Sequence, residues 1–347
     1  MRAARKKIMT RSGDPLACPG EPGDAKNSNV YAKVSGMRIV SLLPSATEVL
    51  FALGLDHEVV GVSHECDYPA QARTKPVVIR SRVPGDASPF DIDSFVRHQV
   101  KTGQSLYVVD AEALEELAPD LIITQDLCHV CAGSPDDLAT ALSRFARRPE
   151  VLCLNPQDLG DVWRDILWIG EETCRGRQAE ALVNSIGEDL GELSQAVHGI
   201  TARPRVALLE WLQPLYVGGH WVPEMIHRAG GEDVFGSPGT PSFRIYMDDV
   251  IAAAPDIILI APCGYNAERA REEYRNLNVS EEWNSIPAVR NKRVYALDSN
   301  SLVSRPGPRL VTGIAAMIKL FHPQITIHLD TENAAIPIAA TTHAVNA

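Results

Sequence analysis

The sequence predicts an α/β protein of two similar lobes, each built on a mostly parallel sheet, joined by one long helix, with a ligand cleft between the lobes. Three observations favour this fold class. Short runs rich in β-branched residues alternate with amphipathic stretches, which is typical of parallel α/β units. The same succession of elements occurs twice. A proline-free stretch from Asp161 to about Val197 separates the two copies, and 347 residues that are 45% apolar can bury two cores.

The two copies share three short segments in the same order. Each copy opens on an arginine followed by an apolar run, continues with an AlaProAsp motif that leads into a second apolar run, and ends on a third run. Ordered repetition indicates duplicated architecture more strongly than any single apolar run. We therefore expect three pairs of equivalent strands: 38–43 with 205–210, 118–124 with 254–260, and 151–155 with 294–298.

The stretch between the copies has the spacing of a helix. Leu182, Ile186, Leu190, Leu193 and Val197 recur at steps of three and four residues, which predicts one long amphipathic helix. Another helical pattern precedes it, through Val162, Ile166 and Ile169. Because a flexible linker would be rich in Gly, Ser or Pro, we expect a rigid connector. The predicted segments are a disordered extension (1–36), an N-terminal lobe (37–160), a connecting helical segment (161–198), a C-terminal lobe (199–326) and a disordered tail (327–347).

Charge and cysteine content exclude several classes of function. The formal net charge is −11 and no long Lys/Arg block interrupts the acidic background, which argues against a nucleic-acid or anionic-membrane partner. Seven cysteines over this length do not resemble a disulfide scaffold and indicate a reducing compartment. The first 36 residues lack an apolar leader, and no segment approaches the length of a membrane span. We therefore expect a cytoplasmic monomer.

In the N-terminal lobe, residues suited to ligand binding follow three predicted strands. Ligands of parallel sheets bind beyond the carboxyl ends of the strands. Pro44 and Ser45 follow the first strand, and Ser45 is predicted to cap a helix whose N–H groups face an anionic group, or to be a plain helix cap. The other candidates are His64, Glu65 and Cys66 after the second strand, and Gln125, Cys128, His129 and Cys131 after the third.

These side chains are compatible with more than one chemistry. His64, Cys66, Cys128, His129 and Cys131 would satisfy a soft-metal site for Zn or Cu if the loops converge. The CysHisValCys segment also suits a redox dithiol or a reactive thiol. The alternative is that the cysteines only pack in a loop, as free cysteines often do.

The C-terminal lobe offers a second set of candidates. Tyr216, His220 and Trp221 surround Gly218 and Gly219, which permit a tight turn or a close approach of a ligand. Tyr216 and Trp221 either line an apolar cleft or pack in the core. Later loops add Tyr265, Leu302 and Arg305, the last suited to carboxylate, amide or phosphate recognition or else a plain surface arginine. The signatures of nucleotide-binding and hydrolase folds are missing.

The order of these motifs is similar to that of a known family. The likeness is carried by the segment that begins at Arg38 and by both AlaProAsp motifs. It is also carried by CysAspTyrPro (66–69), GlyGlyHisTrp (218–221) and SerArgProGlyProArg (304–309). The chain from about Met37 to Phe321 resembles the class III substrate-binding proteins, most closely their cobalamin-binding branch. The resemblance implies two α/β lobes joined by a long helix, and a corrinoid, haem or siderophore held between them for an ABC importer.

This chain also departs from the cobalamin-binding branch. Aromatic ligand contacts of that branch align with Glu65, Gln125 and Leu302, whereas Tyr216 keeps an aromatic ring and Arg305 keeps the arginine. The two glutamates that dock on the importer in that branch align with Pro76 and Ser304, so the docking charges are absent. An insertion spans about residues 84–110.

Three hypotheses follow from the sequence. The leading one is a non-catalytic binding protein, with no required cofactor, for a corrinoid or related metal chelate such as haem. The second is an enzyme that uses a cysteine thiolate activated by His64 or His129. The third is a Zn or Cu binding protein that uses the same cysteines and histidines.

Overall fold

The computed structural model describes residues 6–8, 36–85, 87–125, 138, 141–143 and 145–338. The chain divides into two compact units. The first comprises residues 1–87, 94–156 and 160–184, and the second comprises 88–93, 157–159 and 185–347. Each unit contains one sheet whose central strands run parallel, so the predicted fold class is confirmed.

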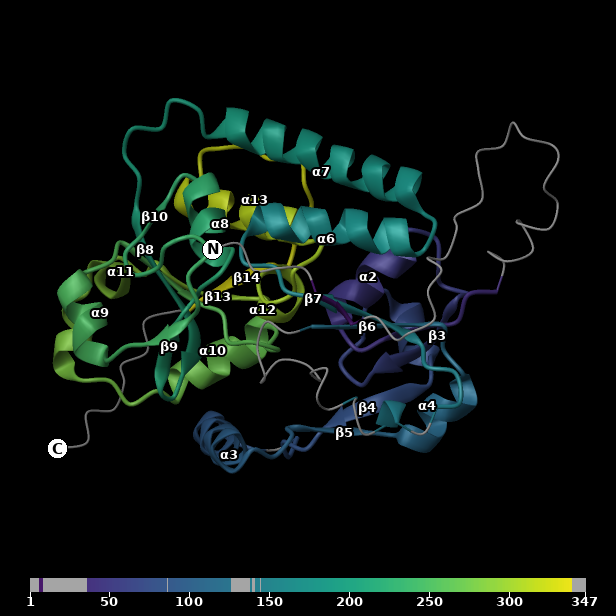
Figure 1. Cartoon of the computed structure of the whole chain (residues 1–347). Coiled ribbons are helices and arrows are strands. Elements are labelled where there is room, and N and C mark those ends of the chain that lie inside the picture. The colour runs from purple at the N-terminus through teal and green to yellow at the C-terminus, as the bar shows by residue number, and fades with distance from the viewer. Residues whose placement is uncertain are drawn as a thin grey trace. The chain divides into compact units, whose positions relative to one another are not determined.

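The sheet of the first unit has the order β1-β7-β6-β2-β3-β4-β5 (Figure 1). Its interior pairs are parallel, and the edge strands β1 and β5 are antiparallel to their neighbours. α4 packs on one face over an apolar cluster that includes Val40 and Ile122, and α2 lies on the opposite face. The bounds are β1 (Lys6–Ile8), β2 (Ile39–Ser41), α2 (Pro44–Ala52), β3 (Val59–Ser63), η1 (Ala70–Thr74), β4 (Val77–Ser81), α3 (Pro89–Thr102), β5 (Tyr107–Val109), α4 (Ala111–Leu117), β6 (Leu121–Gln125), β7 (Glu150–Leu154) and α6 (Leu159–Glu172).

The sheet of the second unit has the order β11-β9-β8-β12-β13-β14, and β10 pairs with β8. Helices α8 and α13 cover one face and α9 to α11 cover the other (Figure 1). On the latter side Trp283 is fully buried, and its indole N–H donates to the Tyr274 hydroxyl at 3.0 Å. The bounds are β8 (Arg205–Leu212), β9 (Leu215–Val217), α8 (Val222–Arg228), β10 (Glu232–Asp233), β11 (Phe243–Arg244), α9 (Met247–Ala253), β12 (Ile257–Ile260), α10 (Ala267–Arg275), η2 (Glu281–Ser285), α11 (Pro287–Arg290), β13 (Val294–Leu297), α12 (Ser299–Leu302), α13 (Leu310–Phe321) and β14 (Ala335–Pro337).

The three predicted strand pairs occupy equivalent places in the two sheets. β2, β6 and β7 are consecutive neighbours in the first sheet, and β8, β12 and β13 are consecutive neighbours in the second. β12 is buried along its whole length, as expected of a parallel strand that is covered on both faces.

The same set of hydrogen bonds, here called the clamp, joins two neighbouring strands at their amino ends in both sheets. In the first unit the Arg38 backbone N–H donates to the Asp120 carboxylate at 3.0 Å, and its carbonyl accepts the Asp120 N–H at 2.8 Å. In the second unit the Arg205 N–H donates to the Asp256 carboxylate at 2.9 Å, and its carbonyl accepts the Asp256 N–H at 2.8 Å.

The alanine of the AlaProAsp motif and the side chain of the arginine complete each clamp. Ala118 and Ala254 adopt φ values of 41° and 46° and end helices α4 and α9 in the left-handed conformation. Each arginine side chain then donates to a carbonyl of the last helical turn, Arg38 to Leu117 and Arg205 to Ala253. The AlaProAsp motif is therefore a helix stop and strand start that is held by the arginine of the neighbouring strand.

The expected long amphipathic helix is α7 (Gly176–Ala196), and the helical pattern expected before it is α6; the chain turns between them at Cys174 with φ 53°. Two expectations about the terminal segments were wrong. The predicted disordered tail includes β14, which pairs with β13 and buries Ile338 in the core of the second unit. The predicted disordered extension includes β1, which pairs with β7. The insertion forms α3 and the edge strand β5.

Removal of either clamp carboxylate should destabilise its unit. We expect Asp256→Ala to lower the free energy of unfolding by about 1 kcal/mol, because the Arg205 N–H loses its acceptor at a partly exposed site, and Asp120→Ala to do the same in the first unit. Urea denaturation measures both. Glu188→Ala, on the exposed surface of α7, is the control and should leave stability nearly unchanged. A stability of Asp256→Ala equal to that of the control would contradict the role of the clamp.

Candidate functional site

The carboxyl edge of the first sheet contains a buried polar cluster at the start of α2. The helix begins at Pro44 after Leu43, which makes no side-chain cap. The expectation that Ser45 caps it was wrong, because Ser45 already lies in the first turn and is buried. Thr47 takes the central position instead: its hydroxyl lies 2.9 Å from Ser41 Oγ, 3.1 Å from the Leu43 carbonyl and 3.1 Å from Cys66 Sγ.

His64 and Cys66 have different surroundings. The Cys66 thiol is buried against Thr47, whereas the His64 ring is exposed and its Nε2 accepts the Ser81 backbone N–H at 3.3 Å. Partial desolvation, followed by the charge of Arg80, lowers the pKa of His64. This agrees with a neutral ring whose Nε2 is an acceptor. The two side chains therefore have different partners.

The predicted metal site gains no support from the structure. Among the residues described, no group of three His, Cys, Asp or Glu side chains is placed to hold a metal ion. Cys128, His129 and Cys131 lie outside the described residues, so their part in the site stays a prediction. Of the remaining candidates here, Gln125 ends β6 and is buried, and Glu65 is exposed.

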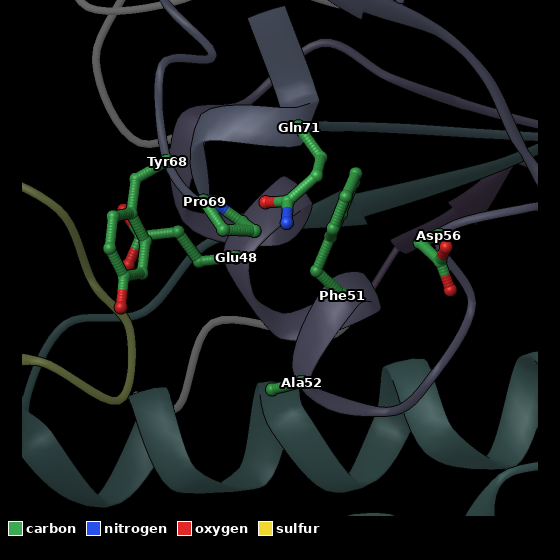
Figure 2. A pocket seen from close by; sticks show the side chains of 7 residues that line it. All are labelled: Glu48, Phe51, Ala52, Asp56, Tyr68, Pro69 and Gln71. Carbon is green, nitrogen blue, oxygen red and sulfur yellow. The ribbon is translucent and has the colours of Figure 1, made fainter.

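A shallow pocket of about 360 Å³ opens beside α2 in the first unit. Figure 2 shows Tyr68 beside Glu48 on one side and Gln71 directed toward Phe51 on the other. Both α2 and the loop before η1 contribute to its wall, and the Tyr68 side chain is 48% exposed. The sequence did not predict this pocket. The predicted site residues were those that directly follow a strand, and the lining residues come later, in α2 and in the loop before η1. Its lining residues are Glu48, Phe51, Ala52, Asp56, Tyr68, Pro69 and Gln71.

Three aromatic side chains lie next to one another at the carboxyl edge of the second sheet. We call them the aromatic row: Tyr216, Trp211 and Tyr265. Tyr216 and Trp211 are directly opposed across the antiparallel β8–β9 pair, so their side chains lie on one face of the sheet. The ring centroids of Trp211 and Tyr265 are 5.7 Å apart in an edge-to-face arrangement, a favourable geometry for aromatic pairs.

An arginine lies at each end of the aromatic row. Arg244 in β11 is paired across the sheet with Tyr216, and its guanidinium lies 5.4 Å from the Tyr246 ring centroid. Arg269 lies 3.8 Å from the Tyr265 ring centroid and donates to the Tyr265 hydroxyl at 3.0 Å. Burial raises the pKa of Tyr265, and the Arg269 charge opposes that shift. The row therefore has a cation at both ends.

Part of this edge was predicted from the sequence. Tyr216 and Tyr265 were among the predicted site residues, whereas Trp211, Arg244 and Arg269 were not. The signal for Trp211 was present, because it directly follows the predicted strand 205–210. The arginines had no such signal, since their positions depend on strand β11 and on the first turn of α10.

The other predicted residues of the second unit mainly hold its loops together. Trp221 is 5% exposed and its indole N–H donates to the Val303 carbonyl at 2.8 Å. Arg305 is buried and donates to Asn300 Oδ1 at 2.9 Å, and the Asn300 N–H donates to the Tyr265 carbonyl at 3.0 Å. Leu302 is a buried residue that ends α12. These contacts fix the loop behind Tyr265.

His220 is held in a left-handed conformation with φ 53°. Its N–H donates to the Thr240 carbonyl at 2.6 Å, and its carbonyl accepts the Gly239 N–H at 2.9 Å. A Cβ on Gly219 would lie 2.2 Å from the Ser242 nitrogen. The glycine therefore lets the backbone at Ser242 pass close to Gly219, and this space is filled by the protein and not by a ligand. Desolvation lowers the pKa of His220, whose buried Nδ1 has no hydrogen-bond partner among the described residues.

Comparisons with known proteins give a consistent result. The profile of the periplasmic binding protein family matches residues 39–301. YvrC of Bacillus subtilis (strain 168), an uncharacterised ABC transporter substrate-binding lipoprotein, is 26% identical over 305 residues, which cover 86% of this chain and 84% of that protein. The vitamin B12-binding protein of Vibrio parahaemolyticus is 23% identical over 287 residues, which cover 82% of this chain and 89% of that protein.

Solved structures show the same fold. The apo form of the periplasmic heme-binding protein RhuT from Roseiflexus sp. RS-1 has a TM-score of 0.63 at 23% identity, covering 83% of this chain and 98% of that chain. The periplasmic vitamin B12-binding protein BtuF of Vibrio cholerae has a TM-score of 0.59 at 22% identity, covering 82% and 96%.

The expectation of a cytoplasmic protein was wrong. The similar proteins are periplasmic binding proteins or lipoproteins, and the matching profile is that of periplasmic binding proteins. Within the described part of the chain, none of the helices combines the length and apolarity that a membrane crossing requires. Cys174 is disulfide-bonded. A structural disulfide is typical of an oxidising compartment.

The lowered pKa of His220 should appear as a pH dependence of stability. Because burial favours the neutral ring, the unfolded chain takes up the proton near pH 6.5 and the folded chain only at lower pH. The stabilisation is therefore present above pH 6.5 and lost as pH falls through this value toward the folded pKa. We expect His220→Asn to flatten the fall in unfolding free energy as the pH drops below 6.5, because asparagine cannot take up the proton and tolerates a positive φ.

The matched control is His57→Asn, because the His57 side chain is 93% exposed. Its stability should follow the wild-type pH dependence in urea denaturation at each pH. Equal slopes for His220→Asn and wild type would contradict the role of burial at His220.

Proposed function

This chain belongs to the periplasmic binding protein family, and from that premise we propose that its ligand is a corrinoid or a related metal chelate such as haem. The coarser function is that of a non-catalytic substrate-binding protein of the ABC importer type. The hypothesis of a thiol-dependent enzyme therefore falls away. The proposal concerns the identity of the ligand and the residues that touch it.

The aromatic row is the observation that carries the proposal. Corrinoids and porphyrins present a broad conjugated or apolar ring face, and aromatic side chains bind such faces with a large contact area at little cost in side-chain entropy. Trp211 and Tyr216 are half-buried, so part of each ring stays accessible. The row lies at the carboxyl end of β8, where ligands of parallel sheets bind.

The support extends to relatives and to the first unit. Proteins similar to this chain are named as vitamin B12-binding or heme-binding. In the first unit we assign to the ligand surface the accessible residues at the carboxyl edge, Pro44, His64 and Glu65. The candidates Ser45, Cys66 and Gln125 are buried and are not assigned to that surface.

We also propose that the protein works outside the cytoplasm beside an ABC importer. Membership of the family supports the importer, and the disulfide at Cys174 supports the compartment. This chain has Pro76 and Ser304 where the cobalamin-binding branch has its docking glutamates. The importer would therefore have to contact other residues.

Ligand titration with two chemically distinct chelates tests this function. We expect haem or cobinamide to bind with a shift of its absorbance bands and to quench tryptophan fluorescence. Trp211→Ala should weaken binding roughly tenfold, because the ring face loses its largest aromatic contact. Trp163→Ala, at a half-buried tryptophan of α6, is the control and should bind like wild type. A folded protein that binds neither chelate would refute the proposed ligand class.

A further inference from the structure

The shallow pocket beside α2, here called the α2 pocket, extends away from the ligand surface assigned to the first unit. Because β2 and β3 are parallel, α2 runs from the carboxyl edge of the sheet at Pro44 toward the amino edge at Ala52, about 12 Å along the helix axis. Asp56, in the turn that leads to β3, lies beyond the end of the helix. The volume of about 360 Å³ is in the range of pockets that hold small organic molecules.

The charged side chains that line the α2 pocket are acidic. Glu48 is only 5% exposed, and the Asp56 side chain is 47% exposed. Among the described residues, the lining contains no Lys, Arg or His. A charge acts more strongly on a neighbouring charge where water is partly excluded. The lining therefore favours a cation, and Glu48 contributes most to this preference.

Three basic side chains near the α2 pocket are directed elsewhere or lie in solvent. The Lys75 ammonium donates to the Asp56 backbone carbonyl instead of its carboxylate, and Arg73 donates to the Asp67 carbonyl at 3.2 Å. The His57 Nε2 lies 3.5 Å from the Asp56 carboxylate, but the His57 side chain is 93% exposed, and exposed pairs of this kind contribute little. These groups reduce the acidic field at the rim beside Asp56 and leave Glu48 as the main charge of the interior.

Two aromatic rings supply the apolar part of the α2 pocket. Tyr68 lies beside Glu48, and Phe51 lies on the other side of the pocket (Figure 2). Tyr68 is 48% exposed and Phe51 is half-buried, so both rings have accessible surface. The face of an aromatic ring attracts a cation, and it also packs against flat apolar groups. A buried carboxylate next to an accessible ring therefore suits a ligand that is cationic at one end and apolar at the other.

We propose that the α2 pocket binds an organic cation that carries a primary ammonium group on a short chain with an aromatic or apolar body. The ammonium lies between Glu48 and Tyr68, and the body lies against Phe51. A bare metal ion fits less well, because no group of three His, Cys, Asp or Glu side chains among the described residues is placed to hold one. This inference goes beyond the proposed function and does not depend on it.

The test compares three probes that share a phenyl ring and differ in charge. They are phenethylamine (a cation), 2-phenylethanol (neutral) and 3-phenylpropionate (an anion), each titrated into the full-length protein and followed by ligand-observed NMR. We expect phenethylamine to bind with a millimolar or tighter dissociation constant, the alcohol roughly fivefold more weakly, and the anion not at all. The preference for the amine should shrink as salt is raised, because salt screens the charges.

Matched variants separate charge from shape. Glu48→Gln keeps the size of the side chain and should weaken phenethylamine binding roughly fivefold, with 2-phenylethanol binding unchanged within about twofold. Asp56→Asn, at a more exposed position, should weaken it about twofold, and this variant decides the test if Glu48→Gln does not fold. Phe51→Leu should weaken the amine and the alcohol alike, because both lose the ring contact. Glu112→Gln, an exposed acid of α4 on the opposite face of the sheet, is the control and should bind like wild type.

The outcomes separate this inference from the proposed function. Equal wild-type affinity for the amine and the alcohol, no binding of the amine, or undiminished amine binding by both acid variants would overturn the inference. Haem or cobinamide, once bound, should not displace phenethylamine. Displacement would also overturn the inference, because the amine would then occupy the chelate site, and would leave the proposed function standing. Failure of both chelates to bind would overturn the proposed function alone, since the amine titrations decide the α2 pocket by themselves.

Discussion

The fold depends on the hydrogen bonds between an arginine at the start of the first strand and the aspartate of an AlaProAsp motif. This clamp fixes the register of β2 with β6 in the first unit and of β8 with β12 in the second. It also ends the preceding helix, because the alanine turns into the left-handed conformation and the arginine side chain binds the last helical carbonyls. With the amino ends of the strands aligned in this way, their carboxyl ends also come to one edge.

The aromatic row of the second unit follows from this alignment. A bulge in β8 lies between Leu209 and Trp211, and bulges commonly redirect side chains at the ends of strands. Trp211 thereby opposes Tyr216 and contacts Tyr265, which follows β12 in the chain. Asn300, after β13, binds the Tyr265 backbone. Residues on or after the neighbouring strands β9, β8 and β12 therefore build the aromatic row, in which Tyr265 is buried.

The sequence predicted the architecture well because repeated motifs carry backbone information. The AlaProAsp motifs and their arginines recur in order, and each member makes the same hydrogen bonds in its unit. The site was predicted less well because side-chain direction depends on features without a local signal. Cys66 and His64 are two residues apart, yet Thr47 holds one and Ser81 holds the other. Arg244 and Arg269 acquire their neighbours only through β11 and α10. For Trp221 the sequence left the cleft and the core as alternatives, and the hydrogen bond from its indole N–H to the Val303 carbonyl holds it in the core.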